Sequence, residues 1–404
     1  MRLRRLIAVG AAGSAALLGL ATAAMAAPAH SGAPGQRAHT TVTSQVSTTR
    51  DDVPPDSLRA LAAKIGLRMG SALIPQDIET PSYAAIAGSQ FSVVTPGNAM
   101  KWQIVEPTQG VFDWSQADEL VNFAHAHHQL IRGHTLLWHN QLPTWLTTGV
   151  ANGTISDAQL KDLLHQHILT EVSRYRGQIW QWDVANEFFT DANPSGINPN
   201  DFWVSHLGAG IISDAFRWAH QADPHALLCY NDYNIAGEDG SNAKSDAVYA
   251  WLKQELAAGV PITCVGDQGH LDTQYGFSGA LMQQDLQRYA SLGLKVAITE
   301  ADVRTFVNNQ TEQVPIDHLA VFAQPFDFGQ MLKACLAVPQ CISFTVWGFT
   351  DADSWVPGFF TGEGYATIYD VNLQPKPAYY ELQQDLRLGA FGAPFRVPTT
   401  GDGD

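Results

Sequence analysis

Positive charge is scarce in this 404-residue chain. Its 23 Lys and Arg residues stand against 39 Asp and Glu residues, which gives a formal net charge of −16 at pH 7. Proteins that bind nucleic acid concentrate positive charge, so this balance argues against a nucleic-acid partner. Charged residues make up only 15% of the chain, whereas aromatic residues reach 10% and include 11 Trp. So many indole rings either fill a core or line a binding cleft, and an acidic surface suits neutral ligands.

Long hydrophobic runs are missing beyond the N-terminus. Residues 1–26 combine a basic start, a run rich in Ala, Gly and Leu, and the small-residue ending "AMA", which predicts a secretory signal peptide. A membrane anchor is the alternative, although the Ala and Gly content makes the run weakly hydrophobic. We therefore expect a secreted protein without a membrane partner. Residues 27–55 have no apolar period and are rich in Ala, Ser, Thr, Gly and Pro, which predicts a disordered leader.

Cysteine is also rare. The chain has four cysteines and no CxxC pair, so a zinc site is not expected. An even number of cysteines in an exported chain favours disulfides. Cys335 and Cys341 close the short loop "CLAVPQC" and form the first expected bridge, which leaves Cys229 to pair with Cys264.

Between residues 56 and 390, short apolar runs alternate with amphipathic stretches of helical spacing. The apolar runs are residues 67–73, 91–96, 130–139, 179–187, 226–234, 262–270, 295–302 and 341–349. Several are apolar almost throughout, as in strands buried on both faces of a parallel sheet. Eight such units predict a single α/β domain, a (β/α)8 TIM barrel. A doubly wound sheet is the alternative, but no Gly-rich phosphate loop follows any of the runs. The tail 391–404 is too short for a second domain, and we expect a monomer.

Polar or aromatic side chains directly follow seven of the eight apolar runs. In a (β/α)8 barrel the strand ends converge on one mouth, where active sites of this fold lie. For any single residue, a buried polar group satisfied by a nearby loop is an equally good explanation, but convergence from so many strands favours a site. The residues concerned include Asn186, Glu187, Asn231, Asp232, Tyr233, Gln268, His270, Glu300, Asp302 and Trp347.

Two carboxylic acids among them, Glu187 and Glu300, end the fourth and seventh runs, on opposite sides of the expected barrel. The cluster has no Cys/His metal spacing, no Ser beside a base and no cofactor loop, so we expect neither a metal nor a cofactor. Paired carboxyl groups among aromatic rings fit glycoside cleavage. One carboxyl protonates the leaving oxygen, the other meets the oxocarbenium-like carbon, and Trp faces stack on sugar rings.

Seven motifs between residues 57 and 388 carry a resemblance to a known family. In order they are "VTPGNAMKW", "RGHTLLWHNQLPTW", "WDVANE", "NDYN", "GDQGHL", "ITEAD" and "TVWGFTDADSW". They resemble the motifs of the family 10 glycoside hydrolases, the endo-β-1,4-xylanases, and the spacing of "CLAVPQC" is similar to that family's disulfide. The resemblance implies a (β/α)8 barrel, a retaining mechanism and an open cleft for xylan and xylo-oligosaccharides.

The resemblance also implies roles for the residues at the strand ends. Glu187 of "DVANE" would be the general acid/base and Glu300 of "ITEAD" the nucleophile. Asn186 would bond the sugar 2-hydroxyl, a contact that strengthens in the transition state. His270 would hold Glu300 in its ionised form, while Asp302 orients the His270 ring.

Further positions have implied supporting roles. Asp232 would favour the protonated form of Glu187 through like-charge repulsion. Tyr233 would stack on the aglycone sugar, and His139 is either structural or part of the site. Core packing is the alternative for each Trp. The other positions that the resemblance assigns to sugar binding are Asn98, Lys101, His134, Trp138, Gln268, Trp347 and Trp355.

One position departs from the family pattern. Gly97 stands where the family usually has a glutamate that bonds the second glycone sugar, and "NPSGINPNDFW" replaces a more acidic loop. The first expectation remains an endo-β-1,4-xylanase. Because of Gly97, the alternative is a related glycosidase that acts on another β-glycoside, such as a saponin oligosaccharide. A non-catalytic carbohydrate-binding barrel would typically have lost a catalytic carboxylate, and both Glu187 and Glu300 are present.

Overall fold

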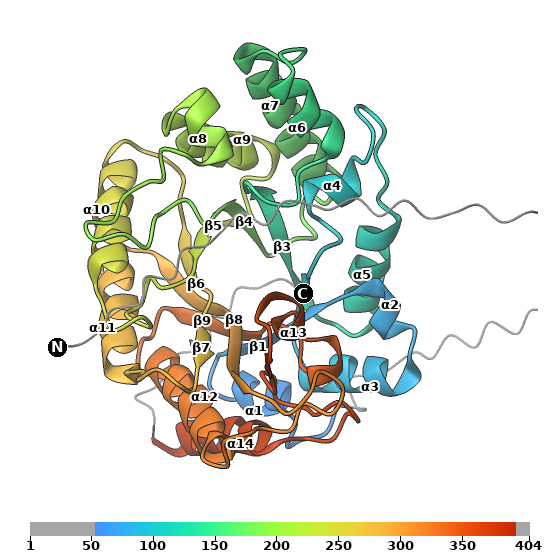
Figure 1. Cartoon of the computed structure of the whole chain (residues 1–404), viewed down its shortest axis with the longest axis vertical. Coiled ribbons are helices and arrows are strands. Elements are labelled where there is room, and N and C mark those ends of the chain that lie inside the picture. The colour runs from blue at the N-terminus through green and yellow to red at the C-terminus, as the bar shows by residue number, and fades with distance from the viewer. Residues whose placement is uncertain (1–52, 393–404) are drawn as a thin grey trace, which may run out of the picture. The chain divides into compact units, whose positions relative to one another are not determined.

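The computed structural model describes residues 53–392, which form a closed barrel of eight parallel strands surrounded by helices (Figure 1). The ring closes because β9 pairs in parallel with both β8 and β1. The barrel strands are β1 (Arg68–Leu73), β2 (Val93–Pro96), β3 (Leu130–Leu137), β4 (Gln181–Asn186), β5 (Leu227–Asp232), β6 (Cys264–Asp267), β8 (Lys295–Phe306) and β9 (Cys341–Val346). Two short strands, β7 (His270–Asp272) and β10 (Glu363–Gly364), pair with the far end of β8.

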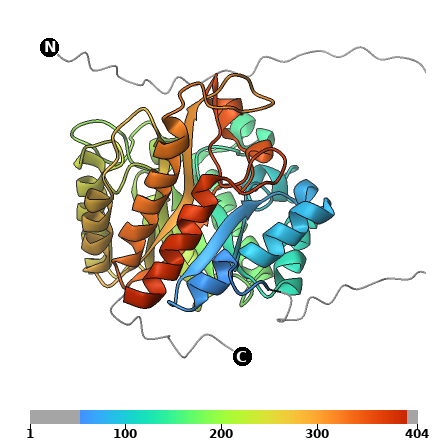
Figure 2. The ribbon, with the colours of Figure 1, turned by 90° about the horizontal axis from the view of Figure 1, so that it is seen from below.

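Helices connect the strands and cover the outside of the barrel (Figure 2). They are α1 (Leu58–Ala63), α2 (Pro75–Ile78), α3 (Pro81–Gln90), α4 (Trp102–Val105), α5 (Ser115–Ala126), α6 (Thr144–Ala151), α7 (Asp157–Arg174), α8 (Phe202–Leu207), α9 (Gly210–Ala222), α10 (Ala243–Ala257), α11 (Gly279–Ala290), α12 (Ala320–Leu336), α13 (Val356–Phe359) and α14 (Pro377–Gly392), with a 3₁₀ turn at Asp351–Asp353. Within the described residues, no helix combines the length and apolarity needed to cross a membrane.

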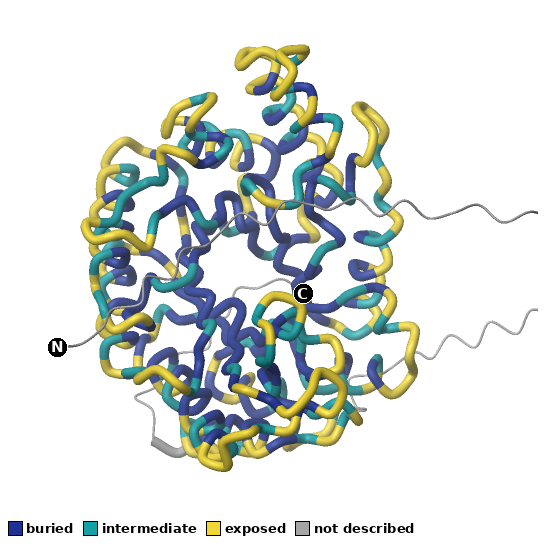
Figure 3. Tube along the Cα trace, in the orientation of Figure 1, coloured by how far each residue is buried: buried dark blue, intermediate teal, exposed yellow. Residues whose placement is uncertain are grey.

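The strands are buried on both faces, as their apolar runs predict. Every residue of β2 and of β4 is buried, and exposed residues concentrate on the outer helices and loops (Figure 3). The helices bury only one side. On α5 the buried residues Ala117, Leu120, Val121 and Ala124 recur at helical spacing and face the barrel. Burial of apolar surface from both layers therefore holds the strands and helices together.

Local sequence signals decide where several helices begin. On α7, the Ser156 side chain accepts a hydrogen bond from the Gln159 backbone N–H, and the Gln159 side chain in turn accepts from the Ser156 backbone N–H. This reciprocal pair satisfies two donors that the first helical turn would otherwise leave without partners. On α8, the Asp201 carboxylate accepts from the backbone N–H groups of Trp203 and Val204. Both caps lie in segments that connect barrel strands, because α7 lies between β3 and β4 along the chain and α8 follows β4.

The eight predicted strands and the (β/α)8 barrel are confirmed. The sixth run differs in detail, because the chain breaks at Gly269, whose φ of +75° suits only glycine well, and continues as β7 beside β8. Both disulfides have the expected pairing: Cys335 with Cys341, and Cys229 with Cys264, which are register partners on β5 and β6. The predicted signal peptide, most of the leader and nearly all of the tail lie outside the described residues, so those boundaries stay predictions.

Candidate active site

The two glutamates lie at the carboxyl ends of barrel strands. Glu187 directly follows β4, and its backbone has a φ of +62°, a left-handed conformation that a non-glycine residue adopts only when its surroundings hold it there. The chain therefore turns at Glu187 instead of extending the strand. Glu300 lies next to Ala301, the last residue of β8 that pairs with β9. Both positions belong to the end of the barrel where active sites of this fold occur.

Two residues connect the glutamates, and each contacts both of them. Gln268 donates its side-chain Nε2–H to Glu187 Oε1 at 2.9 Å, while its backbone carbonyl accepts from the Glu300 N–H at 2.9 Å. Asn231 does the reverse: its carbonyl accepts from the Glu187 N–H at 3.0 Å, and its Nδ2–H donates to Glu300 Oε1 at 2.8 Å. The relative position of the two carboxyl groups is thus fixed by main-chain and side-chain contacts together.

Asn231 uses all of its hydrogen-bonding capacity. Its Nδ2 donates to Asn186 Oδ1 as well as to Glu300, each at 2.8 Å, while its Oδ1 accepts from Thr299 Oγ1 at 2.7 Å and from Arg132 at 3.2 Å. The amide orientation is therefore determined by its partners. Asn186 Nδ2, which is buried, finds no partner within the described residues. This free donor at the strand end agrees with the expected bond to a sugar hydroxyl.

A buried ion pair between Arg132 on β3 and Asp183 on β4 lies within the barrel. Arg132 donates Nε–H to Asp183 Oδ2 at 2.8 Å and makes a second contact with Asp183 Oδ1. Burial alone would raise the pKa of Asp183, but Arg132 and His134 hold it below its usual value. His134 Nδ1 lies 2.9 Å from Asp183 Oδ2, and its ring meets Trp347 edge-on with centroids 5.1 Å apart. Sequence reasoning missed Arg132 and Asp183; charged residues within otherwise apolar strands were the available signal.

On the opposite side, His270 connects Glu300 to Asp302. His270 Nε2 lies 3.4 Å from Glu300 Oε2, and Nδ1 lies 3.0 Å from Asp302 Oδ2, which also accepts from Trp355 Nε1 at 2.7 Å. Burial alone would lower the pKa of His270, but the two carboxylates raise it to about 10. Burial raises the pKa of Glu300, while the His270 hydrogen bond and the nearby histidines outweigh it and lower that pKa below its usual value. The site therefore keeps Glu300 ionised.

Lys101 brings a buried ammonium group to the same region. Its Nζ donates to Asn98 Oδ1 at 3.1 Å and lies 4.8 Å from the ring centroid of Trp138 and 6.0 Å from that of Trp347. Burial lowers the pKa of Lys101 to about 8, although the glutamates act in the opposite direction. Trp138 donates its Nε1–H to Glu187 Oε2 at 2.9 Å. The expected residues Asn98, Trp138 and Trp347 therefore gather around Lys101, whose ammonium group is near both glutamates.

Asp232 has a partner that sequence reasoning missed. Lys244 on α10 is 2% exposed, and its Nζ lies 2.9 Å from Asp232 Oδ1 and 3.0 Å from Asp191 Oδ1. The same ammonium lies 3.5 Å from the ring centroid of Tyr233, whose hydroxyl donates to Asp191 at 3.2 Å. Burial raises the pKa of Asp232 to about 6 although Lys244 lowers it, and the charge of Glu187 adds to the rise. The expected repulsion between Asp232 and Glu187 is thus moderated by a buried cation.

Replacing Lys244 with methionine is expected to destabilise the protein and disturb the side of the site that Tyr233 occupies. Loss of one partner leaves Asp232 buried without its counter-charge, a change that costs about 3 kcal/mol in comparable buried pairs. Thermal melting should show a Tm several degrees lower, and KM for the expected substrates, xylo-oligosaccharides, should rise more than kcat falls.

The exposed residue Lys253, on the same helix, supplies the control variant Lys253→Met. That variant should match the unmodified protein in both measurements. A Lys244→Met protein with unchanged Tm and unchanged KM would show that the buried pair does not position Tyr233.

His139 is held by a helix cap. Its Nδ1 lies 2.9 Å from Asp201 Oδ2, the carboxylate whose other oxygen caps α8. Burial lowers the pKa of His139, but Asp201 outweighs it and raises that pKa above the usual value. Trp203, the second residue of α8, donates its Nε1–H to the carbonyl of Trp138 at 2.9 Å. These contacts join His139 and α8 to the strand end that carries Trp138, which favours the structural explanation for His139.

Gly97 follows β2 in a backbone conformation that other residues can adopt. Its φ does not lie in the left-handed region, and a Cβ added there would lie 3.4 Å from the Leu73 carbonyl oxygen, an ordinary contact. A side chain is therefore compatible with the loop.

Residues 53–392 contain no group of three or more His, Cys, Asp or Glu side chains arranged to hold a metal ion. The chemistry available at the site is that of two carboxyl groups, one held ionised by an imidazolium and the other bonded by an indole and an amide.

Comparison with known proteins agrees with this geometry. The model of glycosyl hydrolase family 10 matches residues 57–385. Endo-1,4-beta-xylanase B of Thermotoga neapolitana is 38% identical over 336 residues, covering 82% of this chain and 91% of that protein. The endo-1,4-beta-xylanase of Agaricus bisporus is 38% identical over 325 residues, covering 80% and 92%. The crystal structure of native xylanase 10B from Thermotoga maritima has a TM-score of 0.76 at 36% identity, covering 83% of this chain and 99% of that one. The chain belongs to glycosyl hydrolase family 10.

Proposed function

We propose that this protein is a retaining endo-β-1,4-xylanase that hydrolyses internal bonds of xylan. The observation that carries the proposal is the arrangement of Glu187 and Glu300, which Gln268 and Asn231 each contact at once. A retaining glycosidase needs two carboxyl groups at a fixed separation, one acting as acid/base and the other as nucleophile. The different surroundings of the two glutamates support this division of roles.

In the first step, Glu300 attacks the anomeric carbon and Glu187 protonates the departing oxygen. His270 and Asn231 contact the two oxygens of Glu300, which keeps the carboxylate ionised and oriented for attack. Gln268 and Trp138 bond the two oxygens of Glu187 and hold that carboxyl group in position for proton transfer. The products of the step are a covalent glycosyl-enzyme and the released aglycone chain.

In the second step, water hydrolyses the bond between Glu300 and the anomeric carbon. Glu187, now ionised, removes a proton from the incoming water, which attacks the anomeric carbon from the face that the aglycone has left. Two inversions restore the β-configuration. The unpartnered Nδ2–H of Asn186 would donate to the sugar 2-hydroxyl, a bond that is strongest in the oxocarbenium-like transition state.

The substrate class rests on the relatives and on the charge of the chain. A family relative, xylanase 10B from Thermotoga petrophila RKU-1, has been solved in complex with xylobiose, with a TM-score of 0.76 at 36% identity. Unsubstituted xylan is a neutral polymer, so a chain of net charge −16 meets no electrostatic penalty in binding it.

Hydrolysis of xylan followed by proton NMR tests the proposal. We expect release of short xylo-oligosaccharides from the polymer, with the β-anomer appearing first and the α-anomer growing in by mutarotation. An α-anomer formed first would rule out double displacement. If xylan stayed intact while another β-glycoside was cleaved rapidly, the alternative would be favoured: a family member that acts on another β-glycoside, as the departure at Gly97 allows.

Replacing Gly97 with glutamate is expected to lower KM for xylotriose. A carboxylate at this position would accept hydrogen bonds from the second glycone sugar, and a charged acceptor contributes about 1.5 kcal/mol, roughly a tenfold change in affinity. The backbone conformation and the 3.4 Å contact at Gly97 predict that Tm stays the same. Steady-state kinetics and thermal melting measure both effects.

Gly97→Ala is the matched control, because it adds the same Cβ without the carboxylate. Its KM should equal that of the unmodified protein. If Gly97→Glu keeps its Tm and binds xylotriose no better than Gly97→Ala does, the position does not mark a weakened subsite.

We also infer that the protein is exported, with cleavage after Ala26. The basic, apolar and small-residue regions of residues 1–26 support this, as do two disulfides, which persist in oxidising compartments. Mass spectrometry of the protein recovered from culture medium should find Ala27 at the N-terminus. A full-length chain that stays with the membrane fraction would instead identify residues 1–26 as an anchor.

A further inference from the structure

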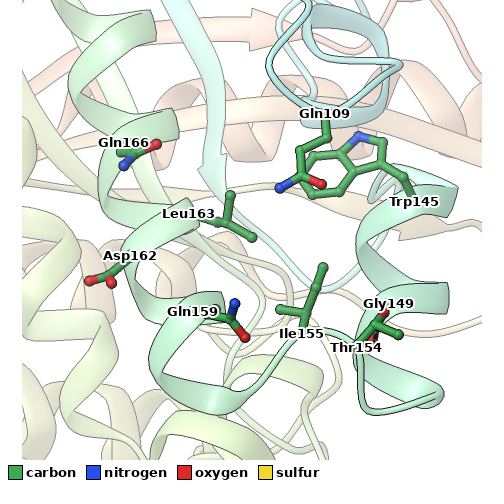
Figure 4. A pocket seen from close by; sticks show the side chains of 9 residues that line it. All are labelled: Gln109, Trp145, Gly149, Thr154, Ile155, Gln159, Asp162, Leu163 and Gln166. Carbon is green, nitrogen blue, oxygen red and sulfur yellow. Dashed lines mark hydrogen bonds between the residues drawn. The ribbon is translucent and has the colours of Figure 1, made fainter.

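A pocket lies apart from the two glutamates. It has a volume of about 450 Å³ and lies between α6, the N-terminal part of α7 and the loop that carries Gln109 (Figure 4). None of its nine lining residues belongs to the site described above. A volume of this size is within the range of small-molecule and sugar-binding pockets.

The walls of the pocket differ in character. Trp145 forms one side, and its indole is fixed because Nε1–H donates to the Glu106 carbonyl at 2.9 Å and the ring meets Trp102 edge-on. Ile155 and Leu163 lie between this ring and the helix α7, as Figure 4 shows. The pocket thus places a fixed, half-buried aromatic ring and two aliphatic side chains within a mostly polar lining, and such a ring can pack against the apolar face of a sugar.

Most groups on the rim of the pocket both donate and accept hydrogen bonds, and Asp162 adds a carboxylate that only accepts. Gln109 and Gln166 lie on opposite sides of the opening and are exposed, and Thr154 adds a hydroxyl (Figure 4). Each amide provides an oxygen acceptor and two N–H donors, which matches the mixed hydrogen bonding of sugar hydroxyls. No lysine, arginine or histidine is among the nine lining residues, so an anionic ligand would find no counter-charge there. The composition favours a neutral, polyhydroxylated ligand.

The pocket is on the side of the barrel that carries the catalytic residues. Helices of a (β/α)8 barrel run back from the mouth, and the lining residues of α7 all lie within its first ten residues, from Asp157 to Gln166. A row of rings separates the pocket from the site: Trp145 meets Trp102 at 6.4 Å, and Trp102 stacks on Trp203 at 5.7 Å. Trp203 in turn bonds the carbonyl of Trp138, which contacts Glu187. The pocket is therefore near the site and distinct from it.

We propose that this pocket is a second, non-catalytic binding site for a segment of the xylan chain. The inference rests on the proposed function, because the occupant is a neutral sugar polymer that the catalytic site already recruits. A polymer bound at one place on the protein is present at the other at an effective concentration of about a millimolar. A weak second site would therefore increase retention on polymeric xylan without changing the chemistry at the glutamates.

Adsorption to insoluble xylan tests the site directly. The measurement uses the full chain with Glu300→Ala, which prevents turnover, and compares it with the same protein carrying Gln109→Ala and Gln166→Ala. Both glutamines are exposed, so the fold is not at risk. We expect the double change to weaken adsorption about threefold to tenfold, the gain that a weak tethered site supplies. The matched control carries Gln254→Ala and Gln284→Ala, exposed positions on α10 and α11, and should adsorb like its parent.

A second measurement separates this site from the catalytic one. With Glu300 intact, the Gln109→Ala, Gln166→Ala protein should hydrolyse an aryl xylobioside with unchanged kcat/KM, because that substrate is too short to occupy both places. Adsorption equal to the parent's would overturn the proposal, and so would a parallel loss of aryl xylobioside turnover, which would place the glutamines in the catalytic site. If the unmodified protein leaves xylan intact while adsorption still depends on the two glutamines, the proposed activity fails and the second binding site stands.

Discussion

Replacing Glu300 with alanine will abolish hydrolysis of every β-xyloside, whatever its leaving group. The glycosyl-enzyme cannot form without this carboxylate, and the surrounding acids have other partners: Asp302 bonds Trp355 and lies against His270, and Asp232 is paired with Lys244. We expect kcat to fall by at least about 10⁴-fold on xylan and on aryl xylobiosides alike, as when a nucleophile is removed. Steady-state assays with both substrates measure the loss.

The fold should survive this change, because His270 keeps its contact with Asp302. Thermal melting checks that point, and Glu119→Ala, which removes an exposed carboxylate on α5, is the control with full activity. Mass spectrometry of the unmodified protein, inactivated by a 2-fluoro-xylobioside with a good leaving group, should locate the sugar on the peptide that contains Glu300. Labelling elsewhere, or turnover by a folded Glu300→Ala protein, would remove Glu300 from the role of nucleophile.

Replacing Glu187 with alanine should slow the glycosylation step only for those substrates whose leaving group needs a proton to depart. Xylan has a poor leaving group, so its hydrolysis should fall by about 10³-fold or more when the general acid is lost. An aryl xylobioside with an acidic phenol leaves without protonation, so its glycosylation step should be largely retained while water attack becomes slow. A burst of phenol followed by slow turnover is the expected time course.

Added azide supplies the second half of this test. Azide needs no general base, and the cavity left by the Glu187 side chain admits a small anion, so turnover of the aryl xylobioside should rise with azide concentration. The product should be a β-xylobiosyl azide, because Glu300 still forms the intermediate and azide attacks from the opposite face. Equal losses on xylan and on the aryl substrate, without azide rescue, would show that Glu187 is not the acid/base.

Local patterns in the sequence were sufficient to predict the barrel and the positions of both glutamates. Strand runs such as residues 341–349 are largely apolar, and this is a property of neighbouring residues that needs no knowledge of the fold. Once eight such runs alternate with helices, their polar ends must meet at one mouth. The same reasoning located Asn186, Gln268 and His270, which the structure brings around the two carboxyl groups.

The partners of these residues depended on the tertiary structure. Arg132 and Asp183 are 51 positions apart, and Lys244 and Asp191 are 53 apart, so no local pattern joins them. A buried charge is stable only with its counter-charge, and which residue supplies it depends on how helices such as α10 pack against the barrel. The pocket between α6 and α7 also depends on how these helices pack, which no local pattern in the sequence shows.

The sequence by itself determined the alternation of strands and helices, the disulfide pairing and the two candidate catalytic carboxyl groups, because each follows from short-range periodicity, from cysteine spacing or from position along a strand. Only the tertiary structure decided which groups contact each oxygen of Glu300, and that Asn186 Nδ2 has no partner among the described residues. It also decided whether Gly97 can accept a side chain. These are properties of distance and burial between segments far apart in the chain, where the electrostatic and hydrogen-bonding energies depend on geometry that sequence order does not contain.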